Sequence, residues 1–176
     1  MHFQAPDYVE ALARYHPMVA YHAIGDYPVP YESIDFEQGM VSKQELTSNI
    51  LMLAKERLAT RTRADAEAAR VRITTMILGT SDPQQLKSYE VKYAEALILM
   101  SNRFAPSTQI EAEAVITGEN VLALAQMVKA QYEAVQNALK PHYGRIDGLR
   151  RVTLTQIQAA TALSDLVTLP DVSWGV

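Results

Sequence analysis

Residues 42–79 decide the fold class, and they read SKQELTSNILMLAKERLATRTRADAEAARVRITTMILG. Apolar residues at the start of this stretch follow helical spacing: Leu46, Ile50, Leu53, Ala54 and Leu58. Ser42 and Glu45 match a capping box, in which two side chains satisfy free amide groups at a helix start. No proline or glycine follows until Gly79, which is suited to cap the C-terminal end. The pattern predicts one helix of about 36 residues, roughly 54 Å long.

The middle of this predicted helix, residues 59–70, has alanine as its only apolar residue type. Such a helix often pairs with another helix at close range, or stands partly in solvent. The arginines between Arg57 and Arg72 alternate with acidic residues, which is typical of a solvated helix face rather than a nucleic-acid site.

Further helices are predicted after Gly79, because capping residues and prolines mark their starts and glycines mark their ends. Thr108 and Glu111 form a second capping box. Pro141, Gly144 and Gly148 predict a break in the last long pattern. The predicted helices cover residues 82–101, 108–117, 120–140 and 149–160. Because short connections favour antiparallel neighbours, we predict a mainly α fold, a helical bundle or a set of helical hairpins.

Residues 1–41 differ in composition from the rest of the chain and are predicted to form a Tyr/Pro-rich N-terminal arm. Residues 42–176 are predicted to form the helical domain. A short helix is predicted to end near Tyr15, followed by extended segments at residues 18–24 and 31–36. An arm this short buries little surface by itself, so its rings need the helical domain or a partner chain to pack against.

Five aromatic residues are therefore candidates for partner binding: Tyr21, Tyr27, Tyr31, Phe36 and, near the other end of the chain, Trp174. Tyrosine brings a large rigid area with a polar tip, which suits interfaces. Rings in the arm equally suit covering the end of the helical body, and both roles stay open. For Trp174, packing onto its own domain is favoured over anchoring a partner.

The composition excludes several kinds of site. The sequence has no cysteine, which excludes disulfides and thiolate nucleophiles, and its net charge of −4 disfavours a nucleic-acid partner. The longest apolar runs, such as residues 94–100, fall far short of the roughly 20 residues that span a bilayer, and residues 1–15 do not resemble a signal peptide. We expect that the protein does not insert into a membrane. We expect that it is made in the cytoplasm.

No familiar catalytic or cofactor motif is found in the sequence. Phosphate-binding glycine loops, HExxH and GxSxG are all missing. His16, His22 and Asp26 lack a further ligand in register for a metal site, so the two histidines are predicted to be surface or packing residues. Glu90 and Glu95 are interpreted as a solvated helix edge rather than a catalytic pair. We expect no metal, no cofactor and no enzymatic activity.

Residues 58–174 resemble a region of small bacteriophage tail proteins encoded near tail-fibre genes. The resemblance rests on the succession of five short segments, ADAEAARVR at 64–72, SYEVKYAEA at 88–96, IEAEAVITG at 110–118, IDGLRR at 146–151 and VSW at 172–174. The chain departs from the family pattern at residues 140–144, KPHYG, where the family has unbroken helix. The family has no catalytic residues to carry over.

The resemblance implies a virion structural protein of the tail, baseplate or fibre-attachment region. Its partners would be other phage tail or fibre proteins, and it would be a homo-oligomer or present in several copies in a larger assembly. The alternative is a tail-fibre assembly chaperone that is absent from the mature virion.

Overall fold

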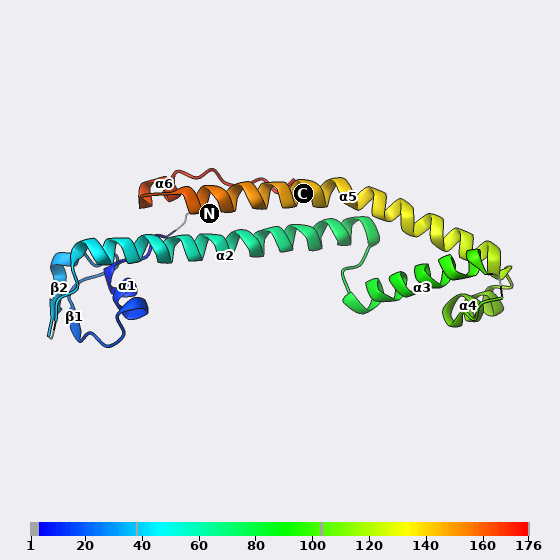
Figure 1. Ribbon diagram of the computed structural model, residues 1–176, viewed down its shortest axis with the longest axis horizontal. Coiled ribbons are helices and arrows are strands. Elements are labelled where there is room, and N and C mark those ends of the chain that lie inside the picture. Colours follow the sequence, from blue (N-terminus) through cyan, green and yellow to red (C-terminus); the bar gives the residue numbers. More distant parts are fainter. Residues whose placement is uncertain (1–3, 38, 103, 176) are drawn as a thin grey trace. The chain divides into compact units, whose positions relative to one another are not determined.

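The computed structural model describes residues 4–37, 39–102 and 104–175, and it is mainly helical (Figure 1). The elements are α1 (Tyr8–Tyr15), β1 (Tyr21–Ala23), the 3-10 turn η1 (Tyr31–Ser33), β2 (Ile34–Phe36), α2 (Lys43–Leu78), α3 (Pro83–Ser101), α4 (Thr108–Thr117), α5 (Val121–Ala159) and α6 (Leu163–Val167). The predicted mainly α fold, with a long first helix after a short β-containing arm, is confirmed. None of the helices in the described ranges has the length and apolarity needed to cross a membrane.

Two compact units divide the chain. Unit 1 comprises Met1–Asp65 and Leu149–Ser173, and unit 2 comprises Ala66–Gly148 and Trp174–Val176. Each unit therefore contains part of α2 and part of α5. The domain boundary predicted at residue 41 stays a prediction.

Unit 1 holds the arm against the first turns of α2. β1 and β2 pair antiparallel, with Tyr21 opposite Phe36. The core beneath them is aliphatic and includes Leu12 of α1 and Leu46 of α2. Asp7 is buried and joins two segments, because one carboxylate oxygen accepts from the Glu10 amide at 2.9 Å and the other accepts from the Val29 amide at 2.9 Å. One side chain thus caps α1 and fixes the loop before η1.

The helices of unit 1 form a second cluster. Ala54 of α2 is fully buried against Ile157 of α5 and Leu166 of α6. Figure 1 shows this last part of α5 lying alongside α2. Lys55 donates from Nζ to the Gln158 carbonyl at 2.9 Å, which adds a polar contact beside the apolar one.

Unit 2 contains two clusters of its own. In the first, α3, α4 and the start of α5 bury Ala96, Leu99, Ile110, Ala114, Leu124 and Ala125. In the second, the end of α2 packs against the middle of α5, burying Ala66, Ala69, Ile73, Leu139 and Ile146. The small alanines let the two helices approach closely, as their enrichment in the middle of α2 suggested.

The predicted break at residues 141–148 is wrong, because α5 is continuous through Pro141. An interior proline costs about 3 kcal/mol of helix stability. Leu139 and Ile146 flank it and are buried, and burying one such side chain contributes about 1.5–3 kcal/mol. Tyr143 also bonds Thr74 at 2.6 Å. Packing against α2 within unit 2 therefore outweighs the local preference for a break.

The capping box predicted at Thr108 and Glu111 is also wrong. Ser107 is the N-cap of α4 and makes no side-chain cap bond to the helix. Glu95 of α3 supplies the cap instead, since its carboxylate accepts from the Gln109 amide at 3.0 Å and the Ile110 amide at 3.3 Å. It also accepts from the Ser107 hydroxyl at 2.8 Å.

Glu95 is thus a structural residue rather than the solvated helix edge that the sequence suggested. Burial raises the pKa of Glu95, but the hydrogen bonds from Ser107, Thr108, Ile110 and Gln109 outweigh it, and the net pKa is lowered. Because the folded-state pKa lies below the unfolded value, the carboxylate stabilises the fold above that unfolded pKa. The contribution is lost as the pH falls through the folded-state pKa.

We predict that Glu95→Ala lowers the free energy of unfolding by about 1 kcal/mol at neutral pH, the usual cost of a lost helix cap. Glu111→Ala is the matched control, because Glu111 is exposed on α4 and should change stability by less than about 0.5 kcal/mol. Urea titrations followed by far-UV circular dichroism measure both. The difference in free energy of unfolding between wild type and Glu95→Ala should disappear at acidic pH. A difference that does not change with pH would contradict the assignment of Glu95 as the cap.

Candidate interaction surfaces

Three of the predicted arm aromatics pack onto the core of their own unit. Tyr21, Tyr31 and Phe36 are half-buried against the aliphatic cluster of unit 1. The Tyr31 hydroxyl donates to the Val41 carbonyl at 2.8 Å, and its ring lies 5.6 Å from the Tyr8 ring and 6.0 Å from the Phe36 ring, centroid to centroid. Much of their area is therefore used within unit 1, and a partner role for what stays exposed remains a prediction.

Tyr27 and Trp174 lie in different settings. Tyr27 is exposed, and its hydroxyl donates to the Ala5 carbonyl. Trp174 is half-buried against the cluster of unit 2 that contains Ile73 and Ile146. This is the placement that the sequence favoured for Trp174, and partner binding by either ring stays a prediction.

The most exposed apolar side chains of the arm are aliphatic and were missed by sequence reasoning. Met18 is 94% exposed, Met40 is 77% exposed and Ile24 is 74% exposed. Met18 and Ile24 lie within the extended segment predicted at residues 18–24, where apolar residues occupy both alternating faces, so the pattern does not indicate which side faces the core. By contrast, Tyr21, Tyr31 and Phe36 cover the core of unit 1.

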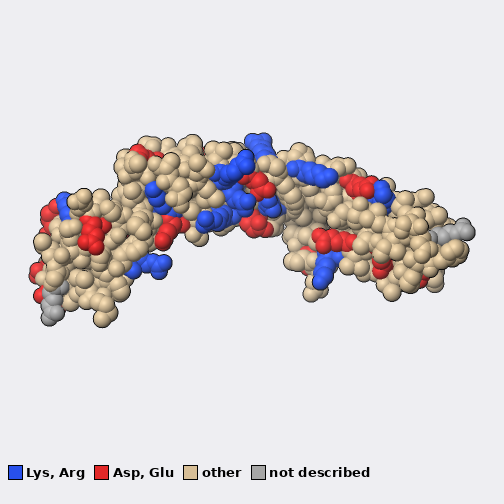
Figure 2. Space-filling model, in the orientation of Figure 1, with Lys and Arg blue, Asp and Glu red and all other residues tan. Residues whose placement is uncertain are grey.

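The arm is also acidic. Between Arg14 and Lys43 the sequence has no lysine or arginine but has four carboxylates, Asp26, Glu32, Asp35 and Glu37. Glu32 pairs with Lys43, and a Glu37 carboxylate oxygen lies 2.6 Å from His22 Nε2. Acidic side chains stand out among uncharged ones at the arm in the view of Figure 2.

A second exposed apolar surface lies on α4 in unit 2. Ile110 and Ala114 face inward and are buried. Val115 and Ile116 face outward, at 84% and 85% exposure. The outer face of α4, defined by Glu111, Ala112, Val115 and Ile116, is thus largely apolar although it is exposed. A helix that is apolar on both faces is normally buried on both.

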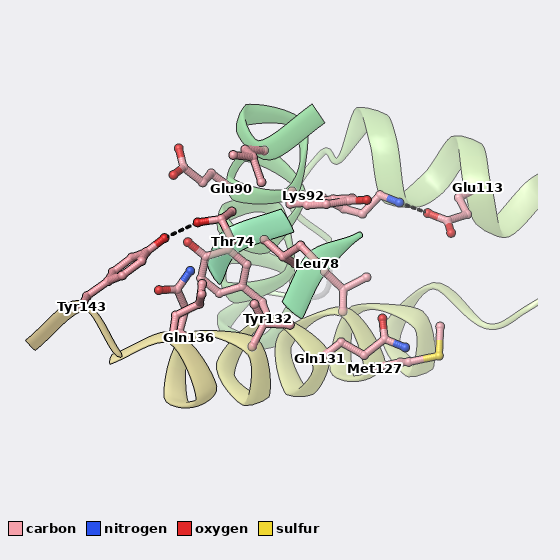
Figure 3. Close-up of a pocket in the computed structure, with 15 residues that line it drawn as sticks. Thr74, Leu78, Glu90, Lys92, Glu113, Met127, Gln131, Tyr132, Gln136 and Tyr143 are labelled. Atoms are coloured by element: carbon pink, nitrogen blue, oxygen red, sulfur yellow. Dashed lines mark hydrogen bonds and ion pairs between the residues drawn. The ribbon is translucent and has the colours of Figure 1, made fainter. Parts of the chain in front are cut away.

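A groove of about 500 Å³ lies in unit 2 between the end of α2, α3, α4 and α5. Aliphatic side chains form much of its lining: Leu78, Leu86, Val128, Val135 and Leu139. Figure 3 shows Leu78 and Tyr132 between the helices, with the bonded Thr74 and Tyr143 toward one end and the Lys92–Glu113 ion pair toward the other. Its volume falls in the range of small-molecule pockets, and four of its polar side chains are engaged in pairs, Thr74 with Tyr143 and Lys92 with Glu113.

Hydrogen bonds and ring contacts fix the walls of this groove. Thr74 donates to the Arg70 carbonyl at 2.9 Å, so the Tyr143 hydroxyl is the donor in the 2.6 Å bond to Thr74. Beside the groove, Tyr93 stacks on Tyr132 with centroids 4.1 Å apart. Such contacts hold the walls of the groove in place.

The charged groups near the stacked rings are likewise paired. The Glu133 carboxylate accepts from Lys129 at 2.7 Å and from the Tyr93 hydroxyl at 3.2 Å. The hydrogen bond from Lys129 is the largest cause that lowers the pKa of Glu133. Burial raises the pKa of Tyr93, and its bond to Glu133 adds to that shift. Glu133 therefore stays ionised as a structural partner at neutral pH.

Metal-binding geometry is missing from the described residues: no three His, Cys, Asp or Glu side chains converge there as ion ligands would. His16 and His22 each contact other residues. His16 Nε2 lies 2.8 Å from the Asn49 amide nitrogen and 3.5 Å from a Glu45 oxygen. His22 pairs with Glu37 rather than with Asp26.

No family model, curated protein or solved structure matches the chain.

We predict that Tyr31→Ala lowers the free energy of unfolding by about 2 kcal/mol, because a half-buried ring and its hydrogen bond to Val41 are lost. Ile24→Ala, at an exposed position of the same arm, should change stability by less than about 0.5 kcal/mol. Thermal and urea unfolding of both variants measure the difference. Equal, small effects would mean that the Tyr31 ring does not belong to the core.

Proposed function

We propose that the chain is a structural component of a bacteriophage tail, in the tail, baseplate or fibre-attachment region, and that it works through protein–protein contacts. The observation that carries this proposal is the outer face of α4, where Val115 and Ile116 are exposed on a helix whose other face is buried. Exposed apolar area of this kind gains stability when a second protein covers it. The resemblance of residues 58–174 to small tail proteins supplies the phage context.

The arm adds to this proposal. Its exposed Met18, Ile24 and Met40 lie on a segment that is tied down by the Asp7 bonds and by packing on α2. A rigid segment with exposed apolar side chains suits contact with neighbouring subunits, since little conformational entropy is lost on binding. We propose that the arm contacts neighbouring tail or fibre proteins, while α4 of unit 2 docks a further subunit or a fibre.

A tail-fibre assembly chaperone is the second candidate, and the groove of unit 2 favours it. An open groove with an aliphatic lining suits a transient hold on an apolar segment of an unassembled fibre. Such a chaperone would leave once the fibre assembles, so the two candidates differ in whether the chain stays in the particle.

Quantitative mass spectrometry of purified virions tests the leading proposal. We expect the chain at the copy number of a structural protein. Absence from virions, together with fibre solubility that depends on co-expression of this chain, would reject the structural role and favour the chaperone.

The outer face of α4 is tested by the double variant Val115→Gln/Ile116→Gln, which keeps helix propensity and removes apolar area. We expect incorporation into virions to fall by about tenfold, because loss of two central apolar contacts costs on the order of 1–2 kcal/mol of binding. Met76→Gln, at an exposed methionine on α2 of the same unit, is the matched control and should incorporate normally. Normal incorporation of the double variant would remove α4 from the interface.

A further inference from the structure

We infer that β1 is a docking edge, where an extended segment of another protein adds as a third strand and brings alternating apolar and basic side chains. This inference rests on the proposed function, because it names the chemistry of the partner that the arm would bind. It follows from the hydrogen-bond pattern of the hairpin, the exposed side chains beside it and the charge of the arm.

The hairpin leaves one row of main-chain groups open. The Ile24 amide donates to the Ser33 carbonyl at 3.1 Å, and the Glu37 amide donates to the Ala20 carbonyl at 3.0 Å. In an antiparallel ladder this pattern points the main-chain amide and carbonyl of His22 toward β2. The main-chain amides and carbonyls of Tyr21 and Ala23 point to the opposite side, away from β2. Within the described ranges, no hydrogen bond reaches the amides or carbonyls of Tyr21 and Ala23.

The opposite edge of the hairpin is less available. Ile34 of β2 is buried, and its amide already donates to the Tyr31 carbonyl in the turn before the strand. By contrast, Ala23 is exposed. An added strand therefore has its best access along β1.

β1 is only three residues long, but it carries no lysine, proline or bulge that would block an added strand. Natural edges are often blocked by lysines, prolines or bulges within the strand, and β1 consists of Tyr21, His22 and Ala23 in regular pairing. Open edges of this kind accept extended peptides, with main-chain bonds for affinity and alternate side chains for specificity.

Side chains beside β1 define the partner. Met18 precedes the strand and Ile24 follows it, and both are highly exposed, so a partner segment gains from apolar side chains. Asp26, which follows β1 in the sequence, and Asp35, which lies opposite His22 on β2, are exposed and make no ion pair within the described part of the chain. These free carboxylates favour lysine or arginine in the segment.

Charge also decides between a foreign segment and a second copy. Residues 15–42 have no lysine or arginine, so two arms packed edge to edge would bring carboxylates of like sign together. A basic segment relieves that repulsion and pairs with Asp26 and Asp35. We therefore assign the edge to a different protein.

A short synthetic peptide that alternates valine and lysine is the probe, and one that alternates valine and glutamate is its control. NMR titration of the isotope-labelled full chain follows the amides. We expect the Val/Lys peptide to shift and protect the Tyr21 and Ala23 amides, and to bind at least about tenfold more tightly than the Val/Glu peptide. Equal binding of the two peptides, or shifts elsewhere with none at β1, would overturn the inference.

A pair of variants isolates the main-chain contribution. Ala23→Pro removes the outward amide but none of the hairpin's own bonds, and prolines are tolerated on edge strands. Ala23→Thr keeps the amide. We expect Ala23→Pro to weaken Val/Lys binding by about tenfold and Ala23→Thr to leave it unchanged. If the two variants bind alike, the peptide is not an added strand.

Charge reversal gives the second readout. Asp26→Lys with Asp35→Lys should exchange the preference, so that the Val/Glu peptide binds more tightly than the Val/Lys peptide. These peptide measurements are independent of whether the chain is found in virions. Failure of the edge and failure of the tail assignment are thus told apart.

Discussion

The pairing of α2 with α5 is the contact on which the rest of the fold depends. α2 is 36 residues long, but its middle offers alanine as its apolar residue type, and alanine buries little area per residue. Isolated helices of modest amphipathicity are marginal in water, so α2 requires a neighbour. In unit 1 that neighbour is the end of α5 at Ile157, and in unit 2 it is the middle of α5 at Leu139 and Ile146. Polar contacts then set the register in unit 2, where Arg70 pairs with Asp147 at 2.6 Å and lies over the Tyr143 ring.

Signals within a few residues of one another allowed much of the fold to be predicted from the sequence. The amide of Glu45 bonds the Ser42 hydroxyl, Asp82 caps α3, and Gly79 and Gly118 end their helices with positive φ. Those features are local because a cap needs only its own first or last turn. The wrong predictions came from distant partners. Pro141 stays helical because α2 packs on both sides of it, and Glu95 caps α4 from another helix, an arrangement that no spacing within residues 107–118 encodes. Contacts between residues far apart in the sequence can be identified only once the fold is known.

For the candidate surfaces, too, distant contacts decided what the sequence could not predict. Partner binding was predicted for the large aromatic side chains of the arm because of their size. Tyr31 and Phe36, however, pack on the core of unit 1. Highly exposed apolar side chains include instead Met18 and Ile24 in the arm and Val115 and Ile116 on α4. The size of a ring predicts how much area it can bury. Whether that area is buried within the unit depends on which side of the strand or helix faces the core. The sequence could not supply that side for strands of three residues, because alternation over so short a run has no clear phase.

The inward rings nevertheless bear on the arm's proposed role. Packing of Tyr31 on Tyr8 and Phe36, with its hydroxyl on the Val41 carbonyl, holds η1 and β2 against α2. Asp7 holds the preceding loop through the Val29 amide. β1 pairs with β2 and so inherits this support. An edge that is ordered before it meets a partner loses less conformational entropy on binding, which matters because a three-residue strand offers few hydrogen bonds to offset that loss. The buried aromatic residues can therefore serve binding without touching a partner, by fixing in place the strand that would.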